Sequence, residues 1–133
     1  MDQQYGLSLP GGPMTPTLTP ILHVADIDEI AAWYVDLGFE LIIRDQQDAV
    51  GWAHLTFGGS RLLLCSDGSA PERRSRDVGL YCRVPDLDAV IERIRDRLPQ
   101  AGPPVETFYG MREVVVHDPN GVRIAFAEAM DWS

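Results

Sequence analysis

The chain has 133 residues, 45% of them hydrophobic and 23% charged, and this length and composition predict one globular domain with a core of its own. Acidic residues outnumber basic ones by 20 to 11, which gives a formal net charge of −9. Such a charge argues against nucleic acid as a partner, because phosphate binding needs a basic surface. No apolar run reaches the roughly 18 residues of a membrane span, so no membrane partner is expected either.

The N-terminus lacks the basic-then-apolar pattern of a secretory signal, because Asp2, Gln3 and Gln4 are followed by glycines and prolines. We therefore expect a cytoplasmic protein. Cys65 and Cys82 stand singly in strand-like runs, which favours two reduced thiols over a disulfide.

Residues 1–16 are rich in proline and glycine and poor in apolar anchors, so they are predicted to form a flexible arm. The remaining residues, 17–133, are predicted to form a single domain. We divide it into module one (17–66), a polar linker (67–77), module two (78–128) and a C-terminal tail (129–133).

Module one begins with a strand-like pattern at residues 17–24. Asp26 then supplies a helix N-cap, and Gly38 a helix end. Between them one helical face is apolar, with Ile27, Ile30, Ala31 and Tyr34. Three further strands are predicted at residues 39–44, 50–57 and 61–65, with Gly58 and Gly59 as the turn between the last two.

Module two repeats this order about 60 residues later: residues 24–28 (VADID) recur at 84–88 (VPDLD). Its predicted elements are a strand at 78–84, a helix at 86–98, an irregular strand at 103–109, and strands at 112–117 and 122–127 that flank a D-P-N-G turn. Each half is therefore βαβββ, and the two modules are expected to share one core. A groove between paired modules is a natural place for a ligand.

Two segments carry a family resemblance, residues 26–39 (DIDEIAAWYVDLGF) and 109–121 (YGMREVVVHDPNG). In this order and spacing the chain resembles the vicinal oxygen chelate superfamily, which includes glyoxalase I, extradiol dioxygenases, and the fosfomycin and bleomycin resistance proteins. The resemblance covers about residues 17–128. The second segment is most similar to the bleomycin-resistance branch, where W/Y-G-x-R-E-F precedes D-P-x-G.

The resemblance implies an α+β fold in which two tandem βαβββ modules form a curled mixed sheet, or half-barrel, with the helices outside. It also implies a concave ligand-binding surface. The bleomycin-binding relatives are bacterial homodimers with drug sites in grooves between subunits and an N-terminal arm that can exchange between partners. We expect the same of this chain.

Enzymes of the superfamily hold a divalent metal on four strand positions, which correspond here to Thr19, Leu63, Gly79 and Ala125. None of these side chains offers imidazole, carboxylate or thiolate. No metal, cofactor or catalytic residue is therefore predicted. An improvised site built from the three histidines and Glu113 stays open as an alternative.

Strand alternation places Ile21 and His23 on the same face as Thr19, and Trp52 on the same face as His54. Trp52 and Tyr109 are expected to form aromatic walls of the cleft. The full set of predicted ligand-binding residues is Thr19, Ile21, His23, Trp52, His54, Leu63, Tyr81, Arg83, Tyr109, Glu113 and Val115.

These features predict a metal-free protein that confers antibiotic resistance by sequestering a drug-like small molecule, aromatic and cationic in character. Two alternatives stay open. One is a lyase, isomerase or dioxygenase of the same superfamily with an atypical metal site, and the other is a structural dimer without a small ligand. The sequence does not identify the ligand.

Overall fold

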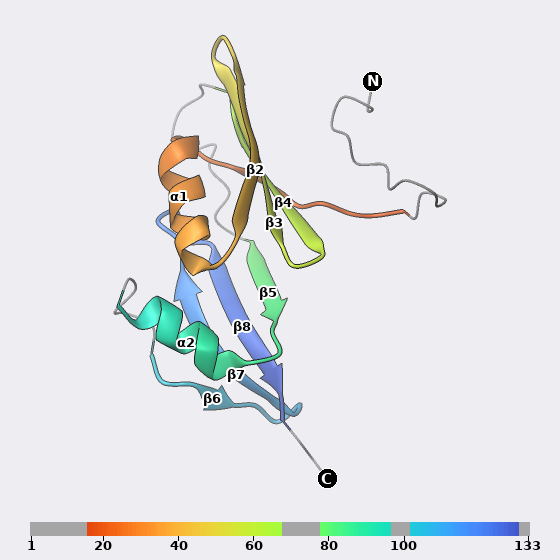
Figure 1. Ribbon diagram of the computed structural model, residues 1–133, viewed down its shortest axis with the longest axis vertical. Coiled ribbons are helices and arrows are strands. Elements are labelled where there is room, and N and C mark those ends of the chain that lie inside the picture. The colour runs from red at the N-terminus through yellow and green to blue at the C-terminus, as the bar shows by residue number, and fades with distance from the viewer. Residues whose placement is uncertain (1–15, 68–77, 97–101, 131–133) are drawn as a thin grey trace.

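The computed structural model describes residues 16–67, 78–96 and 102–130. The predicted arm, most of the predicted linker and the end of the tail lie outside these ranges. The described chain forms two four-stranded mixed sheets, neither of them closed into a barrel, and two helices that lie on the same side of the molecule (Figure 1). This confirms the predicted α+β fold of two tandem βαβββ modules. None of the described helices is long and apolar enough to cross a membrane.

Module one has the strand order β1-β4-β3-β2. Its first and last strands pair in parallel and its other pairs are antiparallel. The elements are β1 (Ile21–His23), α1 (Ile27–Leu37), β2 (Glu40–Gln47), β3 (Val50–Phe57) and β4 (Ser60–Ser66).

Module two has the equivalent order β5-β8-β7-β6, again with the first and last strands parallel. Its elements are β5 (Gly79–Arg83), α2 (Leu87–Arg95), β6 (Val105–Glu106), β7 (Met111–His117) and β8 (Arg123–Ala129). No strand pairing joins the two sheets within the described residues, so the modules meet through side chains.

Both helix starts and the end of α1 follow the predicted caps, whereas α2 ends at Arg95, before the predicted end at Leu98. The carboxylate of Asp26 accepts a hydrogen bond from the backbone N–H of Glu29 at 3.1 Å, and that of Asp86 accepts one from Ala89 at 3.2 Å. Gly38 ends α1 with a φ of 114°, a left-handed conformation that a side chain would strain. The local sequence therefore determines where each helix starts.

Four strands differ from the prediction by two residues or more at one end, and one of them, β2, continues past the predicted end at Arg44 to Gln47. Only Ile21–His23 pairs within the predicted strand 17–24, because Pro20 just before it has no N–H for the ladder. Only Val105–Glu106 pairs within 103–109, after two more prolines. In contrast, β8 runs to Ala129, which pairs with Met111, and so extends into the predicted tail.

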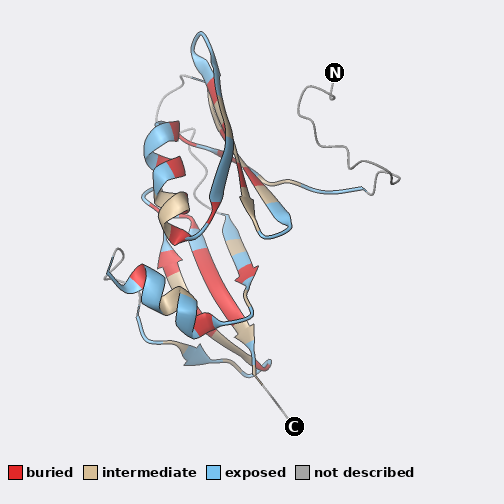
Figure 2. Ribbon diagram, in the orientation of Figure 1, coloured by how far each residue is buried: buried red, intermediate tan, exposed pale blue. Residues whose placement is uncertain are grey.

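The core lies between the helices and the sheets. Helix α1 packs on β2, β3 and β4, α2 packs on β7 and β8, and the two helices contact each other. Buried residues concentrate on β8 and on the inner sides of the helices (Figure 2). Ile27, Ile30, Ala31 and Tyr34 are all buried, which confirms the predicted apolar face of α1.

Aromatic rings connect the two modules through this core. Tyr34 packs edge-on against Phe39, Phe39 lies against Phe57, and Phe57 of module one reaches Phe126 of module two with ring centroids 6.0 Å apart. The hydroxyl of Tyr34 donates a hydrogen bond to Asp118 at 2.9 Å, and both residues are buried. This contact fixes α1 on the D-P-N-G turn of the other module.

We predict that Asp26→Ala and Asp86→Ala each lower the free energy of unfolding by about 0.5–2 kcal/mol, because each removes an N-cap. Asp26→Asn keeps a capping oxygen and should retain most of the stability. Urea denaturation of the three variants and the wild type measures this. Equal midpoints for the alanine variants and the wild type would mean that these caps do not stabilise the helices.

Candidate functional site

The strand register of module one brings five of the predicted residues onto one face, the face opposite α1. Residues that pair across strands point to the same side of a sheet. One row of paired residues runs across β1, β4 and β3 as Ile21, Leu63 and His54. The next row consists of His23, Cys65 and Trp52. Cys65 was not among the predicted site residues, although strand alternation from Leu63 would have placed it on this face.

Module two presents the same lattice of positions. Its rows across β5, β8 and β7 are Tyr81, Ala125 and Val115, then Arg83, Ala127 and Glu113. The duplication therefore makes Trp52 and Glu113 structural equivalents, and likewise His23 and Arg83. The two faces have one geometry and different chemistry.

The last two predicted residues lie outside the ladders. Thr19 is half-buried and precedes β1. Tyr109 lies in the tight turn between β6 and β7, where Thr107 accepts a hydrogen bond from the N–H of Gly110 and donates its own N–H to Met111. Gly110 has a φ of 86°, so this turn requires glycine. The turn holds Tyr109 beside β7 and leaves Phe108 almost fully exposed.

A cleft of about 690 Å³ lies between the two modules. This volume is in the range of small-molecule sites. Module one lines it with Leu18, Pro20, Phe39 and residues 57–62, and module two lines it with residues 80–85. Of the predicted site residues only Tyr81 and Arg83 line the cleft. The sequence did not predict Phe39 and Phe57 as site residues. They face β5 only because the two modules pack together, and no local sequence pattern indicates such a contact.

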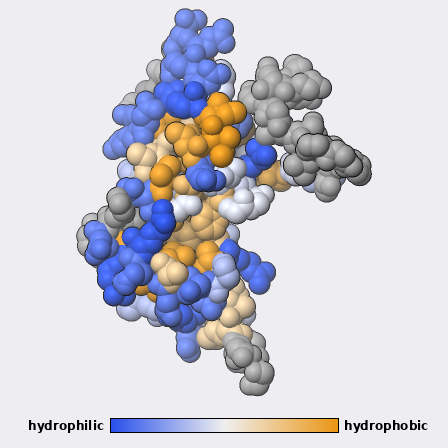
Figure 3. Space-filling model, in the orientation of Figure 1, coloured by the Kyte–Doolittle hydropathy of each residue, from blue (hydrophilic) through white to orange (hydrophobic). Residues whose placement is uncertain are grey.

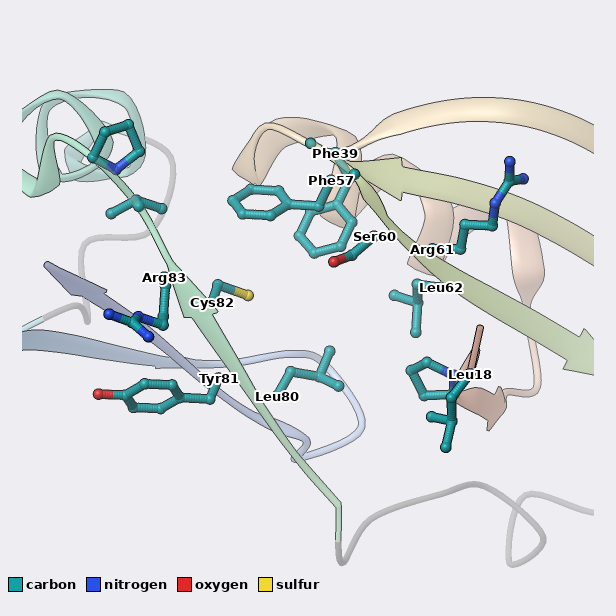
Figure 4. Close-up of a pocket in the computed structure, with 15 residues that line it drawn as sticks. Leu18, Phe39, Phe57, Ser60, Arg61, Leu62, Leu80, Tyr81, Cys82 and Arg83 are labelled. Carbon is teal, nitrogen blue, oxygen red and sulfur yellow. The ribbon is translucent and has the colours of Figure 1, made fainter. Parts of the chain in front are cut away.

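The close-up of the cleft shows how β5 divides its side chains (Figure 4). Leu80 and Cys82 project toward the phenyl rings of module one, whereas Tyr81 and Arg83 project to the opposite side of the strand. Burial raises the pKa of the Cys82 thiol to about 11, so it is neutral and behaves as an apolar lining group. The interior of the cleft is thus mainly apolar, with arginines at its margins.

Glu113 forms the main polar cluster on the face of module two. The hydroxyls of Tyr81 and Tyr109 each donate a hydrogen bond to Oε2 of Glu113, both at 2.6 Å. The hydrogen bond from Tyr109 has the largest effect in holding the pKa of Glu113 below its ordinary value, and that from Tyr81 the next largest. The positive charge of Arg123 contributes in the same direction. The same bonds raise the pKa of Tyr81 to about 12. The carboxylate is therefore ionised at neutral pH although it is only 7% exposed.

The corresponding region of module one is less polar. Burial, and then the positive charge of Arg61, lowers the pKa of His54, which leaves its imidazole uncharged at neutral pH. Trp52 is half-buried, and its indole N–H is buried without a hydrogen-bond partner among the residues that the structure describes. A missing bond of this kind costs about 1–3 kcal/mol. A ligand or a second chain with an acceptor near this ring would remove that cost.

The residues at the superfamily's metal positions offer no set of side-chain ligands for a divalent ion. Leu63 and Ala125 occupy the centres of the two faces, and Gly79 pairs with Arg123, whose charge would repel a cation. Among residues 16–67, 78–96 and 102–130, no group of three or more histidine, cysteine and acidic side chains is arranged to hold a metal.

Comparison with known protein families gives a match over most of the chain. The sequence profile described as "Glyoxalase/Bleomycin resistance protein/Dioxygenase superfamily" matches residues 17–126, which is most of the chain and spans both modules. No curated protein sequence matches the chain significantly.

Solved structures with the same fold include proteins that bind antibiotics. A bleomycin resistance determinant encoded on transposon Tn5 is 23% identical with a TM-score of 0.70, and the match covers 86% of this chain and 98% of that one. A bleomycin-binding protein in complex with bleomycin is 24% identical with a TM-score of 0.67 at the same coverage, 86% and 98%. An antibiotic-binding protein from Streptomyces sp. CB03234 is 22% identical with a TM-score of 0.64, with 88% and 99% covered. These likenesses establish the fold.

We predict that Glu113→Gln moves the titration of Tyr81 and Tyr109 to lower pH. Donation to a carboxylate raises the pKa of both phenols. The stabilising contribution of Tyr81 is therefore present below pH 10.0 and is lost as the pH rises through about 12, and that of Tyr109 is lost in the same direction. Tyrosinate absorbance in an alkaline titration measures the shift. Glu106→Gln, which removes one charge from the opposite face of the sheet, is the control, and identical titration curves for both variants would contradict the cluster.

Proposed function

Because the chain belongs to the glyoxalase/bleomycin resistance protein/dioxygenase superfamily, we propose that it binds an antibiotic-like small molecule and confers resistance by sequestering it. In this proposal no metal ion and no catalytic step take part. Bound drug leaves the free pool, so protection rises with the abundance of the protein and with its affinity.

The single observation that carries this proposal is the mainly apolar cleft of about 690 Å³ between modules whose central strand positions lack metal ligands. An apolar cleft with a few polar groups is suited to binding. A superfamily enzyme would need imidazole or carboxylate at positions where this chain has Thr19, Leu63, Gly79 and Ala125. The antibiotic-binding proteins of the same fold give independent support to a binding role.

We propose that the ligand is bound by residues of the two sheet faces together with the cleft: Thr19, Ile21, His23, Trp52, His54, Leu63, Tyr81, Arg83, Tyr109, Glu113 and Val115. Tyr81 belongs to both regions, because it lines the cleft and bonds to Glu113. We also propose a cytoplasmic location, and the free thiols of Cys65 and Cys82 suit a reducing compartment.

We expect bleomycin, or another member of a panel of DNA-damaging and peptide antibiotics, to change the tryptophan fluorescence of the purified protein at one equivalent per site. Trp52→Phe should abolish the change, whereas Trp33→Phe, the matched control on α1, should retain it. No change in fluorescence or melting temperature with any compound would contradict the binding role.

Elemental analysis of the untagged protein separates binding from catalysis. The proposal expects no stoichiometric transition metal. About one equivalent of zinc, nickel, iron or manganese, removable by a chelator with loss of an enzymatic activity, would instead establish the alternative of an enzyme with an atypical site.

We further propose that the protein acts as a homodimer. Several large apolar side chains lie exposed on the described surface, namely Ile21, Leu41, Ile42, Val105 and Phe108. Apolar surface is visible over β2, the edge strand of module one, beside the hydrophilic β2–β3 hairpin (Figure 3). Exposed apolar side chains on an edge strand, here Leu41 and Ile42 of β2, commonly mark a protein interface.

Sedimentation of the full-length protein and of a variant beginning at Met14 tests the dimer. We expect a full-length dimer at tens of micromolar and a weaker one after truncation. If Tyr5, Leu7 and Leu9 are buried against a partner, each contributes about 1.5–3 kcal/mol to the free energy of association, and the truncation removes that contribution. A full-length monomer would defeat the dimer proposal. An unchanged dimer after truncation would defeat only the role of the arm.

A further inference from the structure

The structure buries two acidic side chains in its described part, and they are satisfied in different ways. Both oxygens of Asp118 have partners: Oδ1 accepts the N–H groups of Asn120 and Val122, and Oδ2 accepts the Tyr34 hydroxyl. Glu113 accepts two hydrogen bonds on the single oxygen Oε2. Its Oε1 takes no hydrogen bond from any residue that the structure describes. Both carboxylate oxygens of Asp118 are therefore used within the described structure, whereas Oε1 of Glu113 can still accept a hydrogen bond from a ligand.

The two phenols that hold Glu113 come from separate elements, and that of Tyr81 reaches it across a floor of small side chains. Tyr81 lies on β5 and Glu113 on β7, and the strand between them, β8, presents Ala125 and Ala127 on this face. These alanines are fully covered, while about half of each tyrosine side chain is exposed, 48% for Tyr81 and 54% for Tyr109. The result is an aromatic platform on the surface with a carboxylate set into it.

The charges around the platform leave the carboxylate without a direct counter-ion. Arg123 and Arg83 lie on the same face, and Arg123 is near enough to favour the ionised form of Glu113. Neither arginine forms an ion pair with Glu113 within the described parts of the chain. Arg112, the neighbour in sequence, points to the other face, where it pairs with Asp88 at 2.6 Å. The negative charge is therefore available to a group from outside.

We propose that Glu113, Tyr81 and Tyr109 bind the cationic nitrogen of an organic ligand, a protonated or quaternary amine, with Oε1 facing the charge and the two rings contacting the groups around it. This inference rests on the proposed function: β5 is an edge strand, so the apolar body of the same ligand would reach the cleft around that edge. Carboxylate attraction and cation–π contact act together at such a site. One carboxylate and two phenols are too few hard donors for a bound metal ion, and an anion placed against Oε1 would meet the charge of the Glu113 carboxylate itself.

The test uses choline as the charged probe and 3,3-dimethylbutan-1-ol as its neutral isostere, each titrated into the full-length protein and followed by NMR. We expect choline to bind at least about tenfold more tightly than the isostere, a difference in the range of combined ionic and cation–π contacts. Glu113→Gln should remove this preference. Glu106→Gln, which makes the same change in net charge on the opposite face, should preserve it.

Two further variants keep the proposal testable if Glu113→Gln unfolds. Tyr109→Leu removes an exposed ring and should weaken choline binding by at least about threefold, whereas Tyr109→Phe keeps the ring and should weaken it less. Equal affinity of the wild type for choline and its isostere overturns the cation site. The same result is expected if a side chain of a second copy of the protein already occupies the platform, and the proposal is overturned in that case too. Antibiotic binding with no effect of Glu113→Gln on affinity for cationic drugs also overturns it while leaving the proposed function standing. If the wild type binds no antibiotic of the panel, the proposed function itself is overturned.

Discussion

The relative position of the two modules depends on a buried hydrogen bond between the hydroxyl of Tyr34 and the carboxylate of Asp118. The sheets share no strand pairing in the described chain, so contacts made by side chains must hold them, and these include a hydrogen bond from Arg93 to the backbone carbonyl of Asp36. Asp118 also organises the turn between β7 and β8 through two backbone N–H groups. A buried carboxylate that loses a partner costs about 1–3 kcal/mol or more, which makes alternative placements of α1 on this turn unfavourable. This contact and the chain of aromatic rings beside it fix the spacing of the two modules, and with it the width of the cleft between them.

The local parts of the fold could be predicted from sequence because they depend on neighbours in the chain. Asp26, Asp86 and Gly38 determine helix ends by bonds to residues three or four positions away, and strand alternation correctly grouped Ile21 with His23 and Trp52 with His54 on faces opposite the helices. Proline explains where alternation failed: strand-like sequence before Pro20 could not join the ladder.

The rest required contacts between distant segments. Nothing in the pattern around Tyr81 indicates that its hydroxyl reaches Glu113 on the second strand away, since that geometry depends on the register of three strands and on small residues in the middle one. The approach of Phe57 to β5 depends similarly on the packing of one module on another. The sequence therefore predicts most of the residues on each face and a groove between the modules, but not most of the residues that line that groove.

The separation of the two sheets has a consequence for how the molecule could be divided. Residues 68–77 are the part of the sequence that connects one complete sheet with its helix to the other. A cut in this segment would leave two fragments, each with its own caps, strand pairing and half of the Tyr34–Asp118 contact. Their reassociation would then be bimolecular, and a compound seated between them would strengthen it by mass action. The pair of fragments would act as a sensor that reports the presence of a small molecule as the joining of two polypeptides.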